Sequence, residues 1–291
     1  MKKFGILILA ALAGGSWIRA QDRPMERIFV SLSQPDRPGT LVIKHDKGSI
    51  SVLGYEGNEV IVEATRRQTP TPGEVDRNAQ GMTRVPAATI QISARELDNT
   101  VTVISNSRDE TLDLNVKVPR RFSLHLGTIH NGRIVVRNVE GEFEISNTNG
   151  DIQLDDVSGS AVLNTFDGHV TASFLRVAPD APMAFSTVYG KVDVSFPADV
   201  RMRAKMKTDN GRIYTDFEMS LEQRRTRQES RTTGEKRIYL EEWTYARING
   251  GGPEMLFTSF DGNIYLRKIK EPGSRTAQLA GGTPARPMRR P

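Results

Sequence analysis

Glycine recurs at a fixed interval through the middle of this chain, and this spacing constrains the fold more than any other feature. The series comprises Gly132, Gly141, Gly150, Gly159 and Gly168, each nine residues from the next. Residue types also repeat at twice that spacing, so that segments 131–136, 149–154 and 167–172 align. Such self-similarity is typical of proteins in which one small unit stacks on the next.

Between the glycines, apolar residues alternate with polar ones, as a half-buried strand requires. The alternation predicts three inward columns: Ile134, Ile152 and Val170; Val136, Leu154 and Ala172; and Val139, Val157 and Leu175. Phe143 and Ile145 are expected to stack over Ala161 and Leu163, whereas Val135 is expected to face solvent. The Asn-Gly and Asp-Gly pairs predict tight turns with positive φ, and Val-x-Gly predicts the other corner.

Each repeat therefore supplies two short strands and two turns, and it needs a neighbour about 4.8 Å away to bury its apolar face. We predict an all-β, single-domain β-solenoid, β-helix-like, made of stacked short strands with Asn/Asp-Gly turns over residues 21–270. Looser copies of the motif at 45–52, 187–194, 208–214 and 259–266 extend it. A β-sandwich is the alternative, since regularly spaced short strands also suit that architecture.

Two polar stretches interrupt the pattern, near 68–88 and near 222–236. The first contains several prolines and glycines with few apolar residues, and it predicts an exposed loop. The second mixes arginines with glutamates, which is typical of a solvated insertion. We expect both to lack regular structure, and long loops of that kind are often functional, so they are secondary candidates for partner contact.

The two ends of the chain differ in composition from the body. Lys2 and Lys3 precede an apolar run over 4–15, which predicts a signal peptide over residues 1–20 and a secreted, periplasmic or cell-surface protein after cleavage. The run is shorter than the roughly 20 residues of a membrane-spanning helix, so no integral span is expected in the mature form. Residues 271–291 are mainly Pro, Gly, Ala and Arg, which predicts a disordered basic tail.

Charge and cysteine content exclude several classes of function. The formal net charge is +5, of which the signal segment contributes +3 and the tail from Glu271 another +3, leaving about −1 for the body. Nucleic-acid binding therefore has little electrostatic support. The chain has no cysteine, which excludes disulfides, thiol catalysis and thiolate metal sites.

No residue pattern indicates a catalytic or metal centre, so we expect no enzyme activity and no cofactor. The four histidines are scattered and are expected at turns or in solvent: His45, His125, His130 and His169. Regular calcium binding would need a column of carboxylates, and Arg133 interrupts the one that Asp151 belongs to. A polysaccharide lyase or hydrolase is the enzymatic alternative, because four residues are candidates for one outer face: Asp151, Asp155, Asp156 and Arg137.

Aromatic residues near the predicted strand ends are the candidate contacts for a partner. They are Phe166, Tyr189, Tyr214, Phe260 and Tyr265. Their ring faces, exposed along one edge, would suit a cell-envelope glycan or a protein, although aromatic residues at strand ends also act as packing caps. These residues favour a non-catalytic surface module for adhesion or envelope interaction, with a structural or envelope-stress signalling role as a further alternative and the oligomeric state open.

The motifs also carry a family resemblance. The strings Thr-x-Asn/Asp-Gly-x-Ile/Val-x-Leu/Val, the Val-x-Gly links and segment 251–256 ahead of 259–264 resemble the bacterial putative adhesin domain family, from about Ile28 to Lys268. This resemblance implies an exported or membrane-attached β-solenoid of unknown function without recognised catalytic residues. The chain departs from the family pattern in the two polar stretches and in Tyr189, which replaces Asn or Asp before Gly190.

Overall fold

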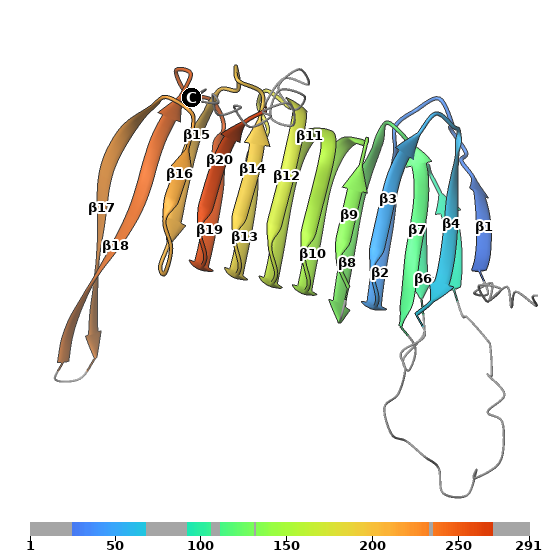
Figure 1. Cartoon of the computed structure of the whole chain (residues 1–291), viewed down its shortest axis with the longest axis horizontal. Coiled ribbons are helices and arrows are strands. Elements are labelled where there is room, and N and C mark those ends of the chain that lie inside the picture. The colour runs from blue at the N-terminus through green and yellow to red at the C-terminus, as the bar shows by residue number, and fades with distance from the viewer. Residues whose placement is uncertain (1–24, 68–91, 106–110, 131, 233–234, 270–291) are drawn as a thin grey trace, which may run out of the picture.

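The computed structural model describes residues 25–67, 92–105, 111–130, 132–232 and 235–269. The predicted signal peptide, the polar stretch near 68–88 and the predicted tail lie outside the described residues. Within the described part the chain forms strands and no α-helix (Figure 1). No helix there has the length and apolarity to cross a membrane.

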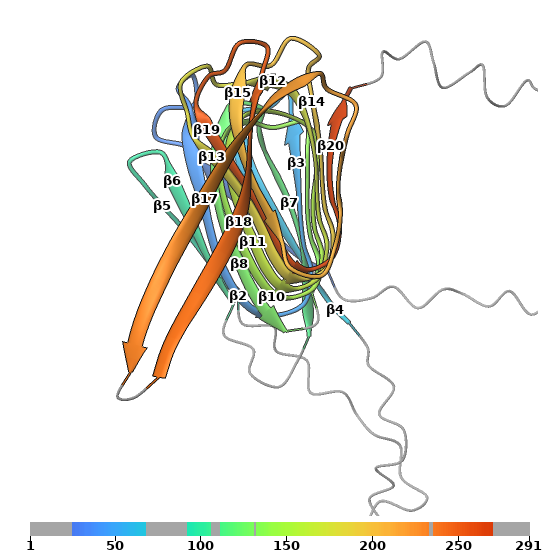
Figure 2. The ribbon, with the colours of Figure 1, turned by 90° about the vertical axis from the view of Figure 1, so that its left-hand side faces the viewer.

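In the described residues, twenty strands join in one sheet that winds into a flattened solenoid with two faces (Figure 2). The first face consists, in spatial order, of β1 (Met25–Ser31), β4 (Glu59–Arg66), β7 (Leu112–Pro119), β3 (Ile50–Tyr55), β9 (Ile134–Arg137), residues 152–157 of β11 (Ile152–Asp167), β12 (Val170–Val177), β14 (Val192–Phe196), β20 (Ile264–Lys268) and β16 (Ile213–Thr215).

The second face has the same kind of order. It consists of β5 (Ile92–Leu97), β6 (Thr100–Ser105), β2 (Gly39–Lys47), β8 (Phe122–His130), β10 (Glu140–Asn149), residues 158–167 of β11, β13 (Met183–Tyr189), β19 (Glu254–Asp261), β15 (Met202–Thr208), β18 (Glu235–Ile248) and β17 (Met219–Thr232). The prediction of an all-β, solenoid-like fold is confirmed.

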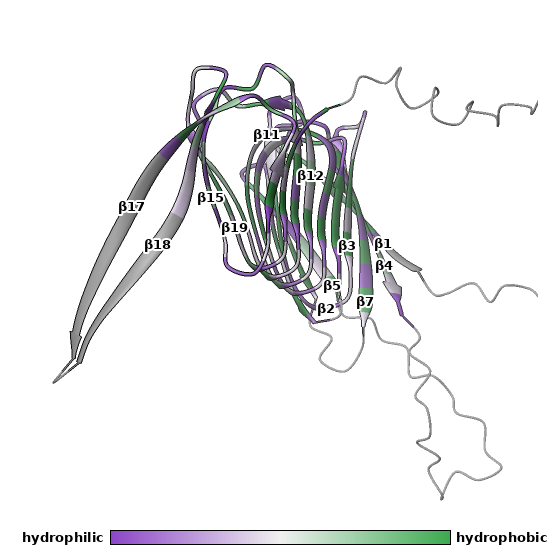
Figure 3. Ribbon diagram, turned by 60° about the vertical axis from the view of Figure 1, so that its left-hand side comes forward, coloured by the Kyte–Doolittle hydropathy of each residue, from purple (hydrophilic) through white to green (hydrophobic). Residues whose placement is uncertain are grey.

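One strand from each face makes a rung of the solenoid. Parallel register places equivalent side chains of successive rungs on top of one another. Ile152 pairs with Ile134 on one side and with Val170 on the other, and Ile145 pairs with Leu163. All five are buried in one continuous apolar core between the two faces. Figure 3 shows hydrophobic segments, in green, recurring on the strands of the solenoid. The inward columns at these positions are therefore as the alternation predicts.

The stacking order of the rungs differs from their order in the chain at both ends of the solenoid. The rung β2–β3 lies between β6–β7 and β8–β9, and the rung β19–β20 lies between β13–β14 and β15–β16. Beyond these rungs, antiparallel strands end the stack: β4 and β1 on the first face, and β5, β18 and β17 on the second. Three of the four edges therefore end in antiparallel strands, and the fourth is the three-residue parallel strand β16, so each edge limits further parallel association.

One corner of the solenoid, where second-face strands turn into first-face strands, is a column of glycines. This glycine edge consists of Gly48, Gly132, Gly150, Gly168, Gly190, Gly262 and Gly211, in stacking order. A Cβ on Gly150 would lie 2.0 Å from the carbonyl oxygen of Gly132, and the φ of Gly150 is +140°. The glycine repeat thus reflects direct backbone stacking between rungs as well as positive φ.

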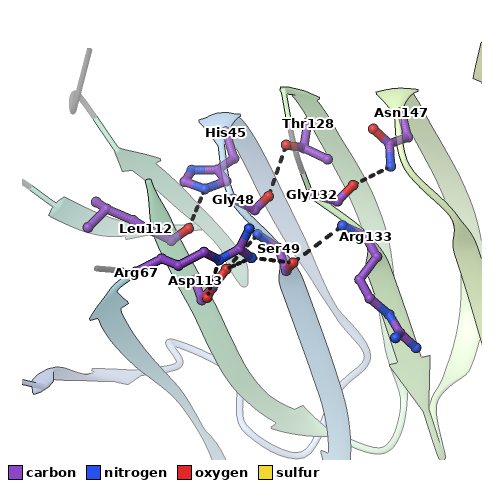
Figure 4. A network of polar contacts seen from close by, with 10 residues as sticks. All are labelled: His45, Gly48, Ser49, Arg67, Leu112, Asp113, Thr128, Gly132, Arg133 and Asn147. Atoms are coloured by element: carbon purple, nitrogen blue, oxygen red, sulfur yellow. Dashed lines mark hydrogen bonds and ion pairs between the residues drawn. The ribbon is translucent and has the colours of Figure 1, made fainter. Parts of the chain in front are cut away.

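Buried and half-buried polar side chains under the glycine edge satisfy its carbonyl groups. In this inner polar ladder Thr128, Asn147, Thr165, Thr187, Ser259 and Thr208 each donate to a glycine carbonyl at 2.8–3.2 Å. His45 occupies the same place at the N-terminal end, where its Nε2 donates to the carbonyl of Leu112 at 2.7 Å (Figure 4). The ladder removes the cost of leaving buried carbonyls without a donor.

Two details of the predicted columns are wrong. Leu175 is 50 % exposed, and Phe174 takes its place beside Val157. The cause is a bulge at Asp156, whose φ is +54°, because β12 has no matching residue and the register shifts. Val135 is only 7 % exposed, although it is in register with Gln153, which faces outward. Gln153 accepts a hydrogen bond from Arg133, the residue before β9.

Two further expectations also fail. The stretch near 222–236 is not structureless, because residues 222–232 and 235–236 belong to the paired strands β17 and β18, a hairpin that extends away from the solenoid (Figures 1 and 2). His45 is not a solvated or turn histidine, since it is only 4 % exposed. Its two ring nitrogens have partners in Ser105 and Leu112, which is why a buried histidine is tolerated.

Candidate functional site

Three of the predicted contact residues form an exposed aromatic row beside the glycine edge. Phe166, Tyr189 and Phe260 are 53 %, 47 % and 49 % exposed. The rings of Phe166 and Tyr189 are 5.6 Å apart between centroids, those of Tyr189 and Phe260 are 6.4 Å apart, and both pairs meet edge to face. The row therefore continues across three adjacent strands, β11, β13 and β19.

Strand alternation explains why the two phenylalanine rings point outward, and Tyr189 is exposed because it ends its strand at the turn. Thr165 and Ser259 turn inward as members of the inner polar ladder, so the next residues, Phe166 and Phe260, face solvent. Tyr189 lies one position later and is in register with Asp167 and Asp261. Its ring therefore stands between the two phenylalanines rather than directly in their column.

A shallow groove of about 500 Å³ follows the glycine edge and has Tyr189 in its lining. Its other side chains are polar and come from several rungs: Ser49, Arg67, Arg133, Asn149, Asp151, Asp167 and His169. The combination of a ring face with carboxylate, amide and guanidinium groups can bind a polyhydroxylated ligand through stacking and hydrogen bonds.

Much of the polarity in this groove is committed to the backbone. Asp151 Oδ1 accepts a hydrogen bond from the amide of His169 at 2.7 Å, and His169 Nδ1 accepts one from the amide of Lys191 at 3.1 Å. Asp113 and Asn263 make equivalent bonds to the amides of Ser49 and Arg212. These side chains therefore hold successive rungs together, and Asp151 and His169 act as structural groups in the described chain.

The other two predicted contact residues lie on the first face, away from the row. Tyr214 of β16 and Tyr265 of β20 stack with ring centroids 5.3 Å apart and an interplanar angle of 12°. Asn263 donates to the hydroxyl of Tyr265 at 3.0 Å, and the Arg267 guanidinium lies 4.8 Å from the centroid of the Tyr265 ring. The five aromatic residues are thus divided between two surfaces.

The acidic residues of the enzymatic alternative have structural partners. Asp155 accepts hydrogen bonds from Arg137 Nε at 3.1 Å and from Gln153 Nε2 at 2.9 and 3.1 Å. Asp156 occupies the bulge of β11, and its amide donates to Ser173 Oγ at 2.9 Å. Across the described ranges, no group of three or more His, Asp or Glu side chains is placed to hold a metal ion.

A larger cavity of about 660 Å³ lies at the opposite edge, among the loops after β12 and β14 and before β19. Its lining combines Leu175, Pro179 and Pro253 with charged residues such as Arg176 and Asp199. Arg176 pairs with Glu140 at 2.7 Å. The predicted contact residues do not line this cavity, so the aromatic row and its groove form the candidate site.

Comparison with known proteins assigns the chain to a family. The sequence model of the Toastrack DUF4097 family matches residues 36–242. The chain belongs to this family. The resemblance to the putative adhesin domains is confirmed. None of the curated proteins matches the chain.

Solved structures with similarity to this Toastrack chain are distant. They include a putative cell adhesion protein from Clostridium sporogenes (11 % identity, TM-score 0.44, 85 % of this chain and 100 % of that one). A putative adhesin from Bacteroides fragilis has 10 % identity and a TM-score of 0.26 over 84 % of this chain and 97 % of its own. A putative lipid binding protein from Parabacteroides distasonis has 8 % identity and a TM-score of 0.27 over 86 % and 98 %.

The Toastrack chain also has a cationic patch that no sequence motif marks. It consists of Arg203, Lys205 and Lys207 of β15 and Arg247 of β18, beside the rings of Trp243 and Tyr245. Lys205 Nζ lies 4.5 Å from the Trp243 ring centroid and 6.0 Å from that of Tyr245. A signal was available, because basic residues alternate at 201, 203, 205 and 207.

Proposed function

We propose that this protein is a non-catalytic, exported carbohydrate-binding module of the cell envelope that acts in adhesion through its solenoid surface. The observation that carries the proposal is the aromatic row of Phe166, Tyr189 and Phe260, whose rings are each about half exposed on adjacent strands. Pyranose rings have C–H faces that pack on aromatic faces, while their hydroxyls need polar partners such as those of the adjacent groove.

The spacing of the row supports a linear glycan as the ligand. Adjacent strands of a sheet lie about 4.8 Å apart, which is close to the length of one sugar unit in a chain. Phe166, Tyr189 and Phe260 come from three adjacent strands, so successive units of an extended chain would meet successive rings. The glycine edge and the inner polar ladder fix those strands and so make the surface rigid before binding.

Two further features support a binding role in the envelope rather than catalysis. The candidate acids Asp151 and Asp155 are engaged by a backbone amide and by Arg137 and Gln153, an arrangement that stabilises the sheet. The signal peptide expected over residues 1–20 would deliver the protein to the periplasm or the cell surface, where envelope glycans are available.

The test is a glycan and cell-envelope binding array on the mature protein, with the products checked for cleavage. Binding without cleavage supports the proposal, and the variants Phe166→Ala, Tyr189→Ala and Phe260→Ala should each weaken it. Phe29→Ala is the matched control, because Phe29 is 58 % exposed on β1 at the far end of the solenoid. Cleavage would favour the polysaccharide-acting enzyme, and the absence of both binding and cleavage would favour a structural or signalling role.

A further inference from the structure

We infer that the ligand of the aromatic row is a carboxylated polysaccharide, such as a linear uronic-acid polymer, whose charged groups are bound by the cationic patch on β15 and β18. This inference rests on the proposed function and names its class of ligand. It is carried by the position of the patch, which lies on the same face as the row and one strand beyond its end.

Strand register makes the row and the patch continuous. Phe260 ends the row on β19, and β15 is the next strand, with Lys207 in register with Thr258 and Lys205 in register with Leu256. The amide of Asp209 donates to the carbonyl of Ser259, which places the end of β15 beside Phe260. A chain that leaves the row past Phe260 therefore meets Asp209 first, and Lys207 and Lys205 lie two and four residues further back along β15.

The surface between them is low enough for a polymer to lie along it. Outward positions on β13 and β19 hold Ala184, Ser186, Leu256 and Thr258, whose side chains are uncharged and half-buried. On the far side of β15, the rings of Trp243 and Tyr245 rise from β18 beside Lys205. The ligand would thus meet aromatic rings at both ends of its path, with cations between them.

The charges on the patch favour a ligand that is only moderately anionic. Arg247 forms an ion pair with Glu222, Lys207 lies 3.6 Å from Asp209, and Glu254 is in register with Arg203. The Lys205 ammonium group lies beside the rings of Trp243 and Tyr245, and Lys207 Nζ lies 5.7 Å from the Trp243 ring centroid, so both lysines combine a cation with an aromatic ring. One carboxylate for each sugar, about 4.8 Å from the next, is a lower charge density than that of duplex DNA, with one charge per about 1.7 Å of its axis, and it matches this patch better.

The sign of the charged side chains on the second face also changes along the solenoid. Glu142 and Glu144 face outward on β10, while the outward positions of β15 hold Arg203, Lys205 and Lys207. An acidic polymer is therefore repelled from β10, in the middle of the face, and attracted to β15, nearer its C-terminal end, which would direct its anionic units to the patch.

The experiment compares two forms of one polymer on the mature protein. Polygalacturonate fragments and the same fragments after reduction of their carboxyl groups are titrated calorimetrically, at low and high salt. We expect tighter binding of the carboxylated form, a preference that added salt reduces. The double variant Arg203→Gln/Lys205→Gln should weaken only that form, by about three- to tenfold. Lys117→Gln, an exposed lysine on the first face, is the matched control.

The possible results distinguish a failure of carboxylate recognition from a failure of the proposed glycan-binding function. Equal binding of both polymer forms that is lost in Phe166→Ala would overturn the carboxylate inference and leave the glycan-binding function in place. Binding that responds to neither the aromatic nor the cationic variants would overturn both. Tighter binding of a single-stranded oligonucleotide than of polygalacturonate would overturn the choice of a polysaccharide, since rings and cations also suit that ligand.

Discussion

The middle rungs of the solenoid and its end rungs use the same contacts but connect them differently. In the middle, Thr165 donates to the carbonyl of Gly150, 15 positions away in the chain. In the inserted rung near the C-terminal end, Ser259 makes the same bond to Gly190 across 69 positions. Stacking chemistry is therefore uniform along the glycine edge, whereas the order in which the chain fills the rungs is not.

The largest expected effect comes from filling the glycine edge. A Cβ on Gly150 would meet the Gly132 carbonyl oxygen at 2.0 Å in a backbone with φ of +140°. Gly150→Ala should therefore lower the free energy of unfolding by about 4 kcal/mol or more, a loss typical of severe steric and backbone strain. Urea unfolding followed by circular dichroism measures this loss.

Two further variants compare the inserted rung with the middle rungs and supply a control. Gly262→Ala, in the inserted rung, places its Cβ 1.9 Å from the Gly190 carbonyl oxygen and should cost as much as Gly150→Ala. Gly127→Ala, on β8, meets its nearest atom at 3.4 Å and should be nearly neutral. A mild effect at Gly262 beside a severe one at Gly150 would show that the inserted rung is not stacked as tightly as the middle.

The second prediction tests the core column where the sequence periodicity fails. Phe174 is fully buried and takes the place expected for Leu175, which is half exposed. Phe174→Ala should cost about 3 to 5 kcal/mol, as other buried aromatic truncations do. Leu175→Ala should change stability by less than about 0.5 kcal/mol. Thermal unfolding of the two variants decides the matter, and a larger loss at Leu175 would contradict the register shift at Asp156.

Periodicity predicted the rungs of this fold, including those with the motif copies at 45–52, 208–214 and 259–266, but not the order in which the end rungs stack. Inward residues such as Ile152 and Leu163 follow from alternation and an eighteen-residue spacing, because in the middle each turn of chain stacks on the one before it. The insertion of β19–β20 between two earlier rungs leaves no local trace, since any rung presents the same glycine and apolar columns to a neighbour. The bulge at Asp156 is similarly invisible, as one left-handed residue is enough to shift the register.

The sequence pattern likewise predicts one part of the candidate site and not the other. Phe166, Tyr189 and Phe260 come together because each sits at the glycine end of its strand, a position that the motif itself marks. Tyr214 and Tyr265 follow the glycine instead of preceding it, so they begin first-face strands. The cationic patch escaped notice because β15 and β18 are joined through the polar stretch near 222–236, which composition alone marked as unstructured.

The third prediction concerns the inner polar ladder. Thr165→Val keeps the shape of the side chain but removes the hydroxyl that donates to the Gly150 carbonyl at 3.0 Å. Leaving that buried carbonyl without its donor should cost about 1 to 3 kcal/mol. Thr148→Val makes the same change at an exposed position of β10 and should cost much less. Equal losses in urea unfolding would mean that the ladder adds no more than ordinary strand packing.

The smallest effect is expected at the N-terminal end, where a histidine takes the place of threonine in the ladder. His45 donates from Nε2 to the Leu112 carbonyl, and its Nδ1, 2.6 Å from Ser105 Oγ, accepts from that hydroxyl. This arrangement requires the neutral ring. Burial lowers the pKa of His45 below its ordinary value of 6.5, and backbone hydrogen bonds and the carboxylates of Asp113 and Asp46 oppose this only in part.

Because the folded-state pKa is the lower one, protonation favours the unfolded chain. The stability that neutral His45 contributes is therefore present above pH 6.5 and is lost as the pH falls through the folded-state pKa. Unfolding midpoints measured from pH 7.5 down to pH 5 should fall more steeply for the wild type than for His45→Gln, which keeps a donor but does not titrate. His125→Gln, at an exposed histidine on β8, should follow the wild type. Identical slopes for the wild type and His45→Gln would show that this end of the ladder, like its threonine rungs, does not respond to pH.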